Sequence, residues 1–180
     1  MVENFQIKIV PSKILKQKCE PVKKEDFGKA LDAKMSGMLK IMLSNNGVGL
    51  AGPQVGDPRR IIVAHASDVD INYLKMVNPR VIERSETMVS TEEGCLSVPG
   101  YFIKVPRADT LKVEYNTPMG EVWQATFEGL AAIVIQHELD HLDGITLLDK
   151  SSRLKRTRYL QKRAKLNKKI SRAIKKMSNI

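Results

Sequence analysis

Two histidines one helical turn apart could bind a metal ion together. The run His137-Glu138-Leu139-Asp140-His141 has the pattern His-Glu-x-x-His. It follows an apolar segment, residues 129–136, and if that segment is helical the two imidazoles lie on the same helix face. Glu138 then lies beside the first ligand, within reach of a water molecule on the metal. This arrangement is typical of hydrolysis by a metal-activated water molecule with a carboxylate as the base.

Two histidines leave the site incomplete, because catalytic zinc-type sites usually take three protein ligands and a water molecule. The one remaining histidine, His65, lies in an apolar segment without ligand spacing, so we interpret it as a structural histidine. Cys95 is the better candidate, since a thiolate binds divalent iron or zinc strongly and Gly94 lets the backbone approach closely. Taken alone, Cys95 is more typical of a small buried side chain. Its flanking glycine, proline and acidic residues argue against a plain core strand.

The elements that must hold these residues are short strands around one helix. Apolar residues at helical spacing predict an amphipathic helix within residues 25–43. Strands are predicted at residues 60–65, 73–78, 81–82 and 111–115, and a hairpin turn at 116–120 leads into a strand at 121–127. The helix with both histidines should end near Asp143-Gly144. The pattern predicts a single α+β domain, with short mixed or antiparallel β-sheets around a central metal-binding helix, plus a C-terminal helix.

The charge divides the chain into a mildly acidic body and a strongly basic tail. The net charge is +10, but residues 150–180 hold 13 Lys and Arg and no Asp or Glu. That leaves 17 basic and 20 acidic residues in the first 149, a net charge of −3. We therefore predict a catalytic domain at residues 1–149 and a basic C-terminal helical extension of that domain at 150–180. An anionic partner should meet the tail.

Nothing in the sequence predicts a membrane partner. There is no apolar run of about 18 residues, the length that a membrane-spanning helix needs. The first residues have neither the basic start nor the apolar stretch of a signal peptide. The two cysteines, Cys19 and Cys95, do not make a disulfide framework. These features favour a reducing, cytoplasmic location.

Three segments together resemble the peptide deformylases. They are Gly47-Val48-Gly49-Leu50-Ala51-Gly52-Pro53-Gln54-Val55-Gly56, Glu93-Gly94-Cys95-Leu96-Ser97 and Gln136-His137-Glu138-Leu139-Asp140-His141. Their order and separations match the family, and the likeness runs from about Pro11 to Asp149. A His-Glu-x-x-His run alone is a weak signal, whereas three motifs in register are specific. The resemblance implies removal of the N-formyl group from the initiator methionine of nascent polypeptides, with release of formate.

The resemblance also implies roles for individual residues. The metal ligands would be Cys95, His137 and His141. Glu138 would be the catalytic acid–base residue, and the Gln54 side-chain amide and the Leu96 backbone N–H would stabilise the oxyanion. The family typically uses one Fe²⁺ per chain, and Zn²⁺, Ni²⁺ or Co²⁺ can substitute. Coordination chemistry alone favours zinc, so iron comes only from the resemblance.

The substrate is expected to bind beside the metal as an extended peptide. The loop at Val48 and Gly49 should offer backbone groups to it. By resemblance, the methionine side chain enters an apolar pocket, and helical spacing places part of that pocket on the face of His137. Its expected lining residues are Val48, Leu130, Ile133 and Val134, although core packing is an equal alternative for Leu130. Some bacterial members of the family have a polar or basic residue where this chain has Gly100-Tyr101-Phe102. The contacts that the enzyme makes with substrate residues after the methionine therefore stay open.

Several alternatives stay open at the level of sequence. The tail helix has an apolar stripe at Leu166, Ile170, Ala173, Ile174 and Met177, which could pack against the body. Alternatively, the helix docks on the ribosome near the exit of the nascent chain, as in bacterial-type members. Glu93 and Arg107 could form a supporting ion pair, or Arg107 could be solvated. A zincin-type metalloprotease would need a third ligand, His or Glu, downstream of His141, and the segment after Gly144 offers only Asp149. A non-enzymatic, ribosome-associated protein with a structural metal would need one more Cys or His as a fourth ligand, and Cys19 lies far off in sequence beside Pro21.

Overall fold

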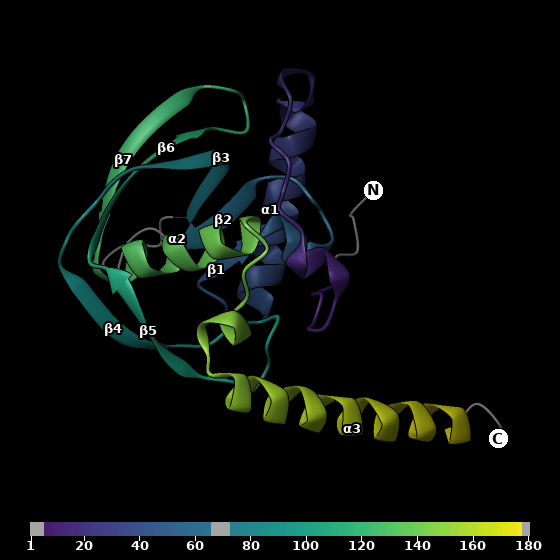
Figure 1. Ribbon diagram of the computed structural model, residues 1–180. Coiled ribbons are helices and arrows are strands. Elements are labelled where there is room, and N and C mark those ends of the chain that lie inside the picture. The colour runs from purple at the N-terminus through teal and green to yellow at the C-terminus, as the bar shows by residue number, and fades with distance from the viewer. Residues whose placement is uncertain (1–5, 66–72, 178–180) are drawn as a thin grey trace.

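The structure is a computed structural model of the chain and describes residues 6–65 and 73–177. Within these residues, seven strands form two antiparallel sheets (Figure 1). The larger sheet has the order β1-β2-β3-β6-β7 and the smaller one pairs β4 with β5. The strands are β1 (Gly49–Ala51), β2 (Ile61–His65), β3 (Tyr73–Arg84), β4 (Met88–Glu93), β5 (Ile103–Ala108), β6 (Thr110–Asn116) and β7 (Val122–Glu128).

The described part of the chain also forms three α-helices, and α2 lies at the centre of the molecule (Figure 1). The helices are α1 (Lys29–Ser44), α2 (Gly129–Leu142) and α3 (Arg153–Met177). Short 3₁₀ helices cover Lys13–Lys16, Lys24–Asp26, Gly52–Val55 and Leu147–Lys150. Helix α2 contacts strands of both sheets and is buried along most of its length. This burial explains why its first turns are apolar on every side. The predicted single α+β domain around a central helix is confirmed.

Strand β2 separates two hydrophobic clusters. Ile61 and Val63 pack with the methionines of α1, whereas Ile62 and Ala64 pack with α2. Because side chains alternate along a strand, one short apolar strand can hold a helix on each face. The larger sheet is thereby fixed between α1 and α2, and the edge strand β1 lies beside α2.

The predicted strands are present, but their number and extent differ. The two segments predicted around residues 73–82 form one long strand, β3. Asn78 has a positive φ of 51°, and the pairing register shifts between Val77 and Arg80. This irregularity at Asn78 and Pro79 interrupts the apolar pattern without ending the strand. Strands β4 and β5 were not predicted, because β4 has only one buried residue and β5 contains Pro106.

Helix α3 packs on a hydrophobic cluster of the described body near its start and then projects away from it (Figure 1). Tyr159 and Leu160 pack on a small cluster beneath Cys95, and the Tyr159 hydroxyl donates a hydrogen bond to the Pro99 carbonyl at 3.2 Å. Further along, the apolar stripe is exposed: the exposed fractions are 45% for Leu166, 47% for Ile170 and 61% for Ile174. The alternative in which this stripe packs on the body is therefore wrong; the Met177 side chain lies outside the described residues.

Among the described helices, none combines the length and the apolar character that crossing a membrane requires.

Candidate active site

Helix α2 places His137, Glu138 and His141 against the edge of the larger sheet. The approach is close because Gly49 of β1 has no side chain. A Cβ at this position would lie 2.4 Å from Oε1 of Glu138 and 2.8 Å from Cγ1 of Val134. Real Cβ atoms do not approach other heavy atoms so closely, so this packing of strand on helix requires glycine.

Cys95 completes a cluster with the two histidines. It follows the end of β4, and one ligand atom from each of Cys95, His137 and His141 lies within 4.8 Å of the others. Sγ of Cys95 and Nε2 of His141 are 3.2 Å apart. A soft thiolate and two imidazoles form a donor set that suits iron or zinc. Three protein ligands leave a position open for a water molecule or substrate, as catalytic sites require.

The state of His141 also fits a metal ligand. The side chain is 1% exposed, and burial lowers its pKa well below the usual value. The imidazole is therefore neutral, which is the form that binds metals. Within the described part of the chain, its Nδ1 atom has no hydrogen-bond partner.

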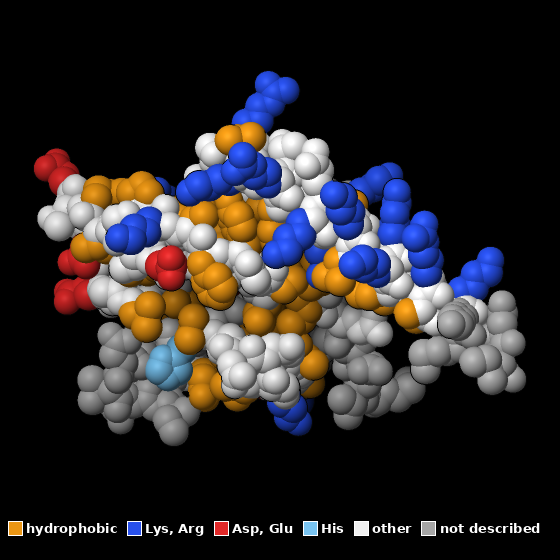
Figure 2. Space-filling view, turned by 90° about the horizontal axis from the view of Figure 1, so that it is seen from below, with side chains coloured by type: hydrophobic (Ala, Val, Ile, Leu, Met, Phe, Trp, Pro, Cys, Tyr) orange, Lys and Arg blue, Asp and Glu red, His pale blue; other side chains and the backbone are white. Residues whose placement is uncertain are grey.

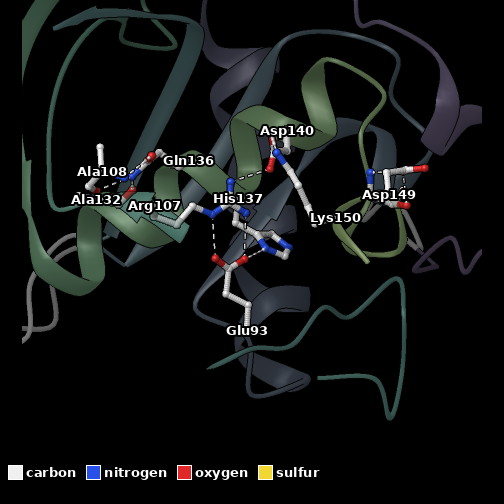
Figure 3. Close-up of polar contacts among 10 residues, drawn as sticks. Glu93, Arg107, Ala108, Ala132, Gln136, His137, Asp140, Asp149 and Lys150 are labelled. Atoms are coloured by element: carbon white, nitrogen blue, oxygen red, sulfur yellow. Dashed lines mark hydrogen bonds and ion pairs between the residues drawn. The ribbon is translucent and has the colours of Figure 1, made fainter. Parts of the chain in front are cut away.

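His137 is oriented by a buried network of charges (Figure 3). Arg107 donates hydrogen bonds of 2.7 and 2.9 Å to the two carboxylate oxygens of Glu93, and a third of 2.6 Å to Asp140. Glu93 in turn accepts a hydrogen bond of 2.8 Å from Nδ1 of His137. Lys150, just before α3, lies 3.1 Å from Asp140. The ion pair of Glu93 with Arg107 is thus buried rather than solvated.

The charge of Glu93 fixes the tautomer of His137. Burial raises the pKa of Glu93, but the hydrogen bonds from Arg107 and His137 outweigh it and lower the pKa to about 2. The carboxylate is therefore ionised and can only accept, so His137 carries a proton on Nδ1. This leaves Nε2 of His137 free to bind the metal, the usual role of a carboxylate behind a metal-bound histidine.

Glu138 is a buried carboxyl group with little to hold its charge. It is 3% exposed, and its Oε2 atom has no hydrogen-bond partner among the described residues. Burial raises its pKa to about 7, although His137 and Arg107 oppose the rise. A carboxyl group that titrates near neutral pH can both accept and donate a proton, as a general base and acid must. An unpartnered oxygen beside the cluster is what a reacting water molecule would satisfy.

The side-chain amide of Gln54 lies beside Cys95. Its Oε1 atom accepts a hydrogen bond of 2.7 Å from the Ala51 N–H, which fixes the orientation of the amide. Its Nε2 group then points to Oγ of Ser97 at 3.2 Å and to Sγ of Cys95 at 3.7 Å. The Gln54 amide is therefore an oriented donor beside Cys95, and the Leu96 N–H, next to Cys95 in the chain, is a donor without an acceptor among the described residues.

A cavity of about 640 Å³ opens onto Glu138 and onto two of the cluster residues, Cys95 and His137. Its volume is typical of a pocket for a ligand larger than a single amino acid. All five residues expected to contact substrate line it: Val48, Gly49, Leu130, Ile133 and Val134. Ile133 and Val134 are each 6% exposed, whereas Leu130 is 46% exposed. Core packing is therefore the wrong interpretation of Leu130.

The remaining candidates lie away from the cluster. His65 packs edge-to-face on Tyr73, with ring centroids 5.4 Å apart. Cys19 belongs to the hydrophobic cluster around α2, and Asp149 pairs with Lys16 and Arg156. Neither Asp149 nor Cys19 is in the metal-ligand group found among the described residues. Nothing in the site therefore supports the protease or the closed structural metal.

Two residues of the site escaped the sequence reasoning. Asp140 and Gln136 lie within the third motif, yet neither was given a role. Gln136 holds α2 on β5: its amide exchanges hydrogen bonds of 3.1 and 2.8 Å with the N–H and carbonyl of Ala108 (Figure 3). The available signal was a polar residue inside an otherwise apolar helix, which burial forces to find a partner.

Comparison with known proteins decides which family this site belongs to. The family model described as "Polypeptide deformylase" matches residues 5–157. The chain belongs to the polypeptide deformylase family. The peptide deformylase of Maricaulis maris is 40% identical over 165 residues, which cover 91% of this chain and 94% of that protein. A peptide deformylase structure from Legionella pneumophila is 33% identical, with a TM-score of 0.83 over 93% of this chain and 98% of that one.

Further deformylase structures were solved with ligands. One from Acinetobacter baumannii, described as bound to Met-Ala-Ser, is 34% identical with a TM-score of 0.79, covering 84% of this chain and all of that one. Another from the same organism is described as bound to actinonin. Deformylases are metal-dependent enzymes that remove the N-formyl group from nascent peptides, and family membership assigns this activity to the chain.

Proposed function

We propose that this deformylase binds one Fe²⁺ ion through Cys95, His137 and His141, and that Zn²⁺, Ni²⁺ or Co²⁺ can replace it. The observation that carries the proposal is the cluster of these three side chains, two of which, Cys95 and His137, line the cavity together with Glu138. When bound, the ion supplies Lewis-acid chemistry and makes a water molecule more acidic. The thiolate and imidazole donors suit either iron or zinc, and the choice of iron rests on the family resemblance.

Side chains and backbone groups of the chain then transfer the proton and stabilise the negative charge that develops on the substrate. Glu138 accepts the proton of the water molecule that attacks the formyl carbon and passes it to the leaving nitrogen. The amide of Gln54 and the N–H of Leu96 donate to the oxygen that becomes negative. Losing one such donor typically costs about 3–4 kcal/mol of transition-state stabilisation. The rigid hold of Ala51 on Gln54 supports this role, since the donor is oriented before substrate arrives.

The substrate is proposed to lie along the free side of β1. His65 donates a hydrogen bond to the Val48 carbonyl at 2.8 Å, so the polar groups of Val48 face β2. Because these groups alternate along a strand, the N–H and carbonyl of Gly49 face the opposite, unpaired side. An extended peptide can pair there, with its methionine side chain among Leu130, Ile133 and Val134. The Met-Ala-Ser complex of the Acinetobacter relative is consistent with such a peptide.

The decisive experiment measures formate release from formyl-Met-Ala-Ser by metal-loaded protein. Replacing Glu138→Ala should lower kcat by about 100- to 10,000-fold, the usual contribution of a general base. The bound metal, measured by mass spectrometry, should remain near one ion per chain in this variant. Cys95→Ala should instead lose the metal. Full activity in the Glu138 variant would refute the assigned role, and undiminished metal in the Cys95 variant would refute the ligand set.

We also propose that α3 docks on the ribosome, where the nascent substrate emerges in the cytoplasm. Figure 2 shows Lys and Arg side chains gathered over the part of the molecule that carries α3. The same helix also exposes its apolar stripe. Exposed apolar side chains do not make a protein more soluble, so the stripe supports a binding role for the helix. If the basic side chains of α3 bind RNA phosphates, the affinity for the ribosome should fall steeply as the salt concentration rises. Ribosome co-sedimentation that is unchanged after deletion of residues 150–180 would contradict the proposal.

A further inference from the structure

Exposed apolar side chains gather around the mouth of the substrate cavity. Phe102 is 62% exposed, Val48 49% and Leu130 46%, and all three line the cavity. They come from separate parts of the fold: the β4–β5 connection, the segment before β1 and the first turn of α2. Single exposed apolar residues need no explanation, but a group around one cavity marks a surface that binds something.

The ring of Phe102 is held at this mouth by Gly94. A Cβ on Gly94 would lie 2.7 Å from Cε1 of Phe102, so the ring rests directly on the glycine backbone. Gly94 immediately precedes Cys95, and both line the cavity. The ring therefore lies against the backbone next to Cys95, with most of its surface exposed to a ligand.

Among the described residues, the cavity lining contains no Lys or Arg, and its one histidine, His137, belongs to the proposed ligand set. Its charged members are Glu92, Glu93 and Glu138. Glu93 is neutralised by Arg107, and Glu138 is buried. Glu92 is exposed; Lys104 faces it across the β4–β5 pair but is not in the lining. A carboxylate on the substrate would lose water against the apolar rim without gaining a positive partner.

The geometry of an extended peptide determines which substrate residue meets the rim. Successive side chains of a strand point to opposite faces. If the methionine side chain enters the buried part of the cavity at Ile133 and Val134, the next side chain points the other way, toward the mouth. It then passes the exposed ring of Phe102.

We infer that Phe102 is a specificity-determining residue, which selects formyl-Met peptides with an apolar or aromatic second residue over those with an acidic one. The inference rests on the proposed function and names the substrate class of the same site. Contact with an aromatic ring of this kind changes binding by a factor of about 3 to 10.

The test compares kcat/KM for formyl-Met-Phe-Ser and formyl-Met-Asp-Ser on each enzyme variant. The ratio of the two values is independent of metal loading and of the folded fraction, since both substrates meet the same sample. The native chain should prefer the Phe peptide by about tenfold or more. Phe102→Ala should reduce this ratio by about 3- to 10-fold. Phe102→Arg should reduce it further by attracting the Asp side chain.

The matched control is Trp123→Ala, which removes an aromatic ring that is 54% exposed but lies outside the cavity lining. This variant should keep the native ratio. A native ratio near one, or equal ratios in the native chain and both Phe102 variants, would overturn the inference while deformylation itself still stands. No formate from either peptide with metal-loaded native chain would refute the proposed function, and the inference with it.

Discussion

At the scale of single residues, the site depends on where side chains are absent as much as on where they are present. Gly49 lets β1 lie against Glu138, and Gly94 carries the ring of Phe102 next to Cys95. Sequence reasoning identified the motif residues from their chemistry, but not these close approaches. Such contacts depend on distances between elements, which local spacing along the chain does not contain.

Replacing Gly49→Ala should abolish most of the activity. The added methyl group would lie 2.4 Å from Oε1 of Glu138, so the carboxylate must move. Because a displacement of about 1 Å in an active site can cost about 100-fold in rate, we expect a loss of that order in kcat. Metal content, measured on the same sample, should stay unchanged. An active Gly49→Ala enzyme would contradict the position of Glu138.

Replacing Glu93→Gln should weaken metal binding. The variant loses the negative charge that holds the proton on Nδ1 of His137. Removing such a support behind a metal ligand typically costs about 10- to 100-fold in affinity. Competition with a chelator measures the change. Glu86→Gln, at an exposed position of the β3–β4 turn, is the control and should bind metal like the native chain.

Asp57 should make part of the stability depend on pH. Burial raises its pKa, but ion pairs with Arg59 at 2.7 Å and Lys34 at 2.9 Å prevail and lower the pKa to about 2, from an ordinary value of 3.8. A lowered pKa stabilises the fold above the unfolded-state pKa, and that stability is lost as pH falls through the folded-state pKa. Asp57→Asn should therefore lower the free energy of unfolding by about 1–3 kcal/mol at neutral pH.

Urea unfolding at neutral and acidic pH tests this prediction. The difference between the native chain and Asp57→Asn should shrink as pH falls from about 3.8 toward 2. Glu114→Gln is the control, because Glu114 pairs with Arg80 at the surface, where ion pairs add little. A difference that is independent of pH would show that Asp57 acts through shape rather than charge.

At the scale of elements, the sequence predicts best what periodicity controls. The strands β2, β6 and β7 and helix α2 follow from apolar patterns, and all are present. Strands β4 and β5 were not predicted because β4 has a single buried residue and β5 contains Pro106, and what defines them is pairing with each other. Yet these two strands and the connection between them place Glu93, Cys95 and Arg107 beside α2. Chemistry and family resemblance identified Cys95 as a candidate ligand, but they did not predict how β4 and β5 position it.

Shortening α3 should leave the body intact. A chain ending at Ala164 keeps Tyr159 and Leu160 on their cluster and removes only the exposed part of the stripe. Since little apolar surface is lost, we expect an unchanged melting temperature and unchanged activity on formylated tripeptides. Leu160→Ala in the full chain is the comparison and should lower the melting temperature. A clear drop after shortening would show that the exposed stripe contributes to the fold.

At the scale of the whole molecule, charge and shape separate two regions. The body is mildly acidic and holds the cavity, whereas the basic residues concentrate on a helix that leaves it. The sequence alone predicted this division of charge. It did not predict that the stripe on the helix would be exposed, because the same amphipathic pattern also fits a helix packed on the body.

The length of α3 has a consequence for how the enzyme finds its substrate. At 1.5 Å per residue, its 25 residues span about 37 Å. If the outer turns bind the ribosome as proposed, this arm tethers the cavity near the emerging chain without covering its mouth. The search for a formylated N-terminus then becomes intramolecular, at an effective concentration set by the arm rather than by the amount of enzyme in the cell.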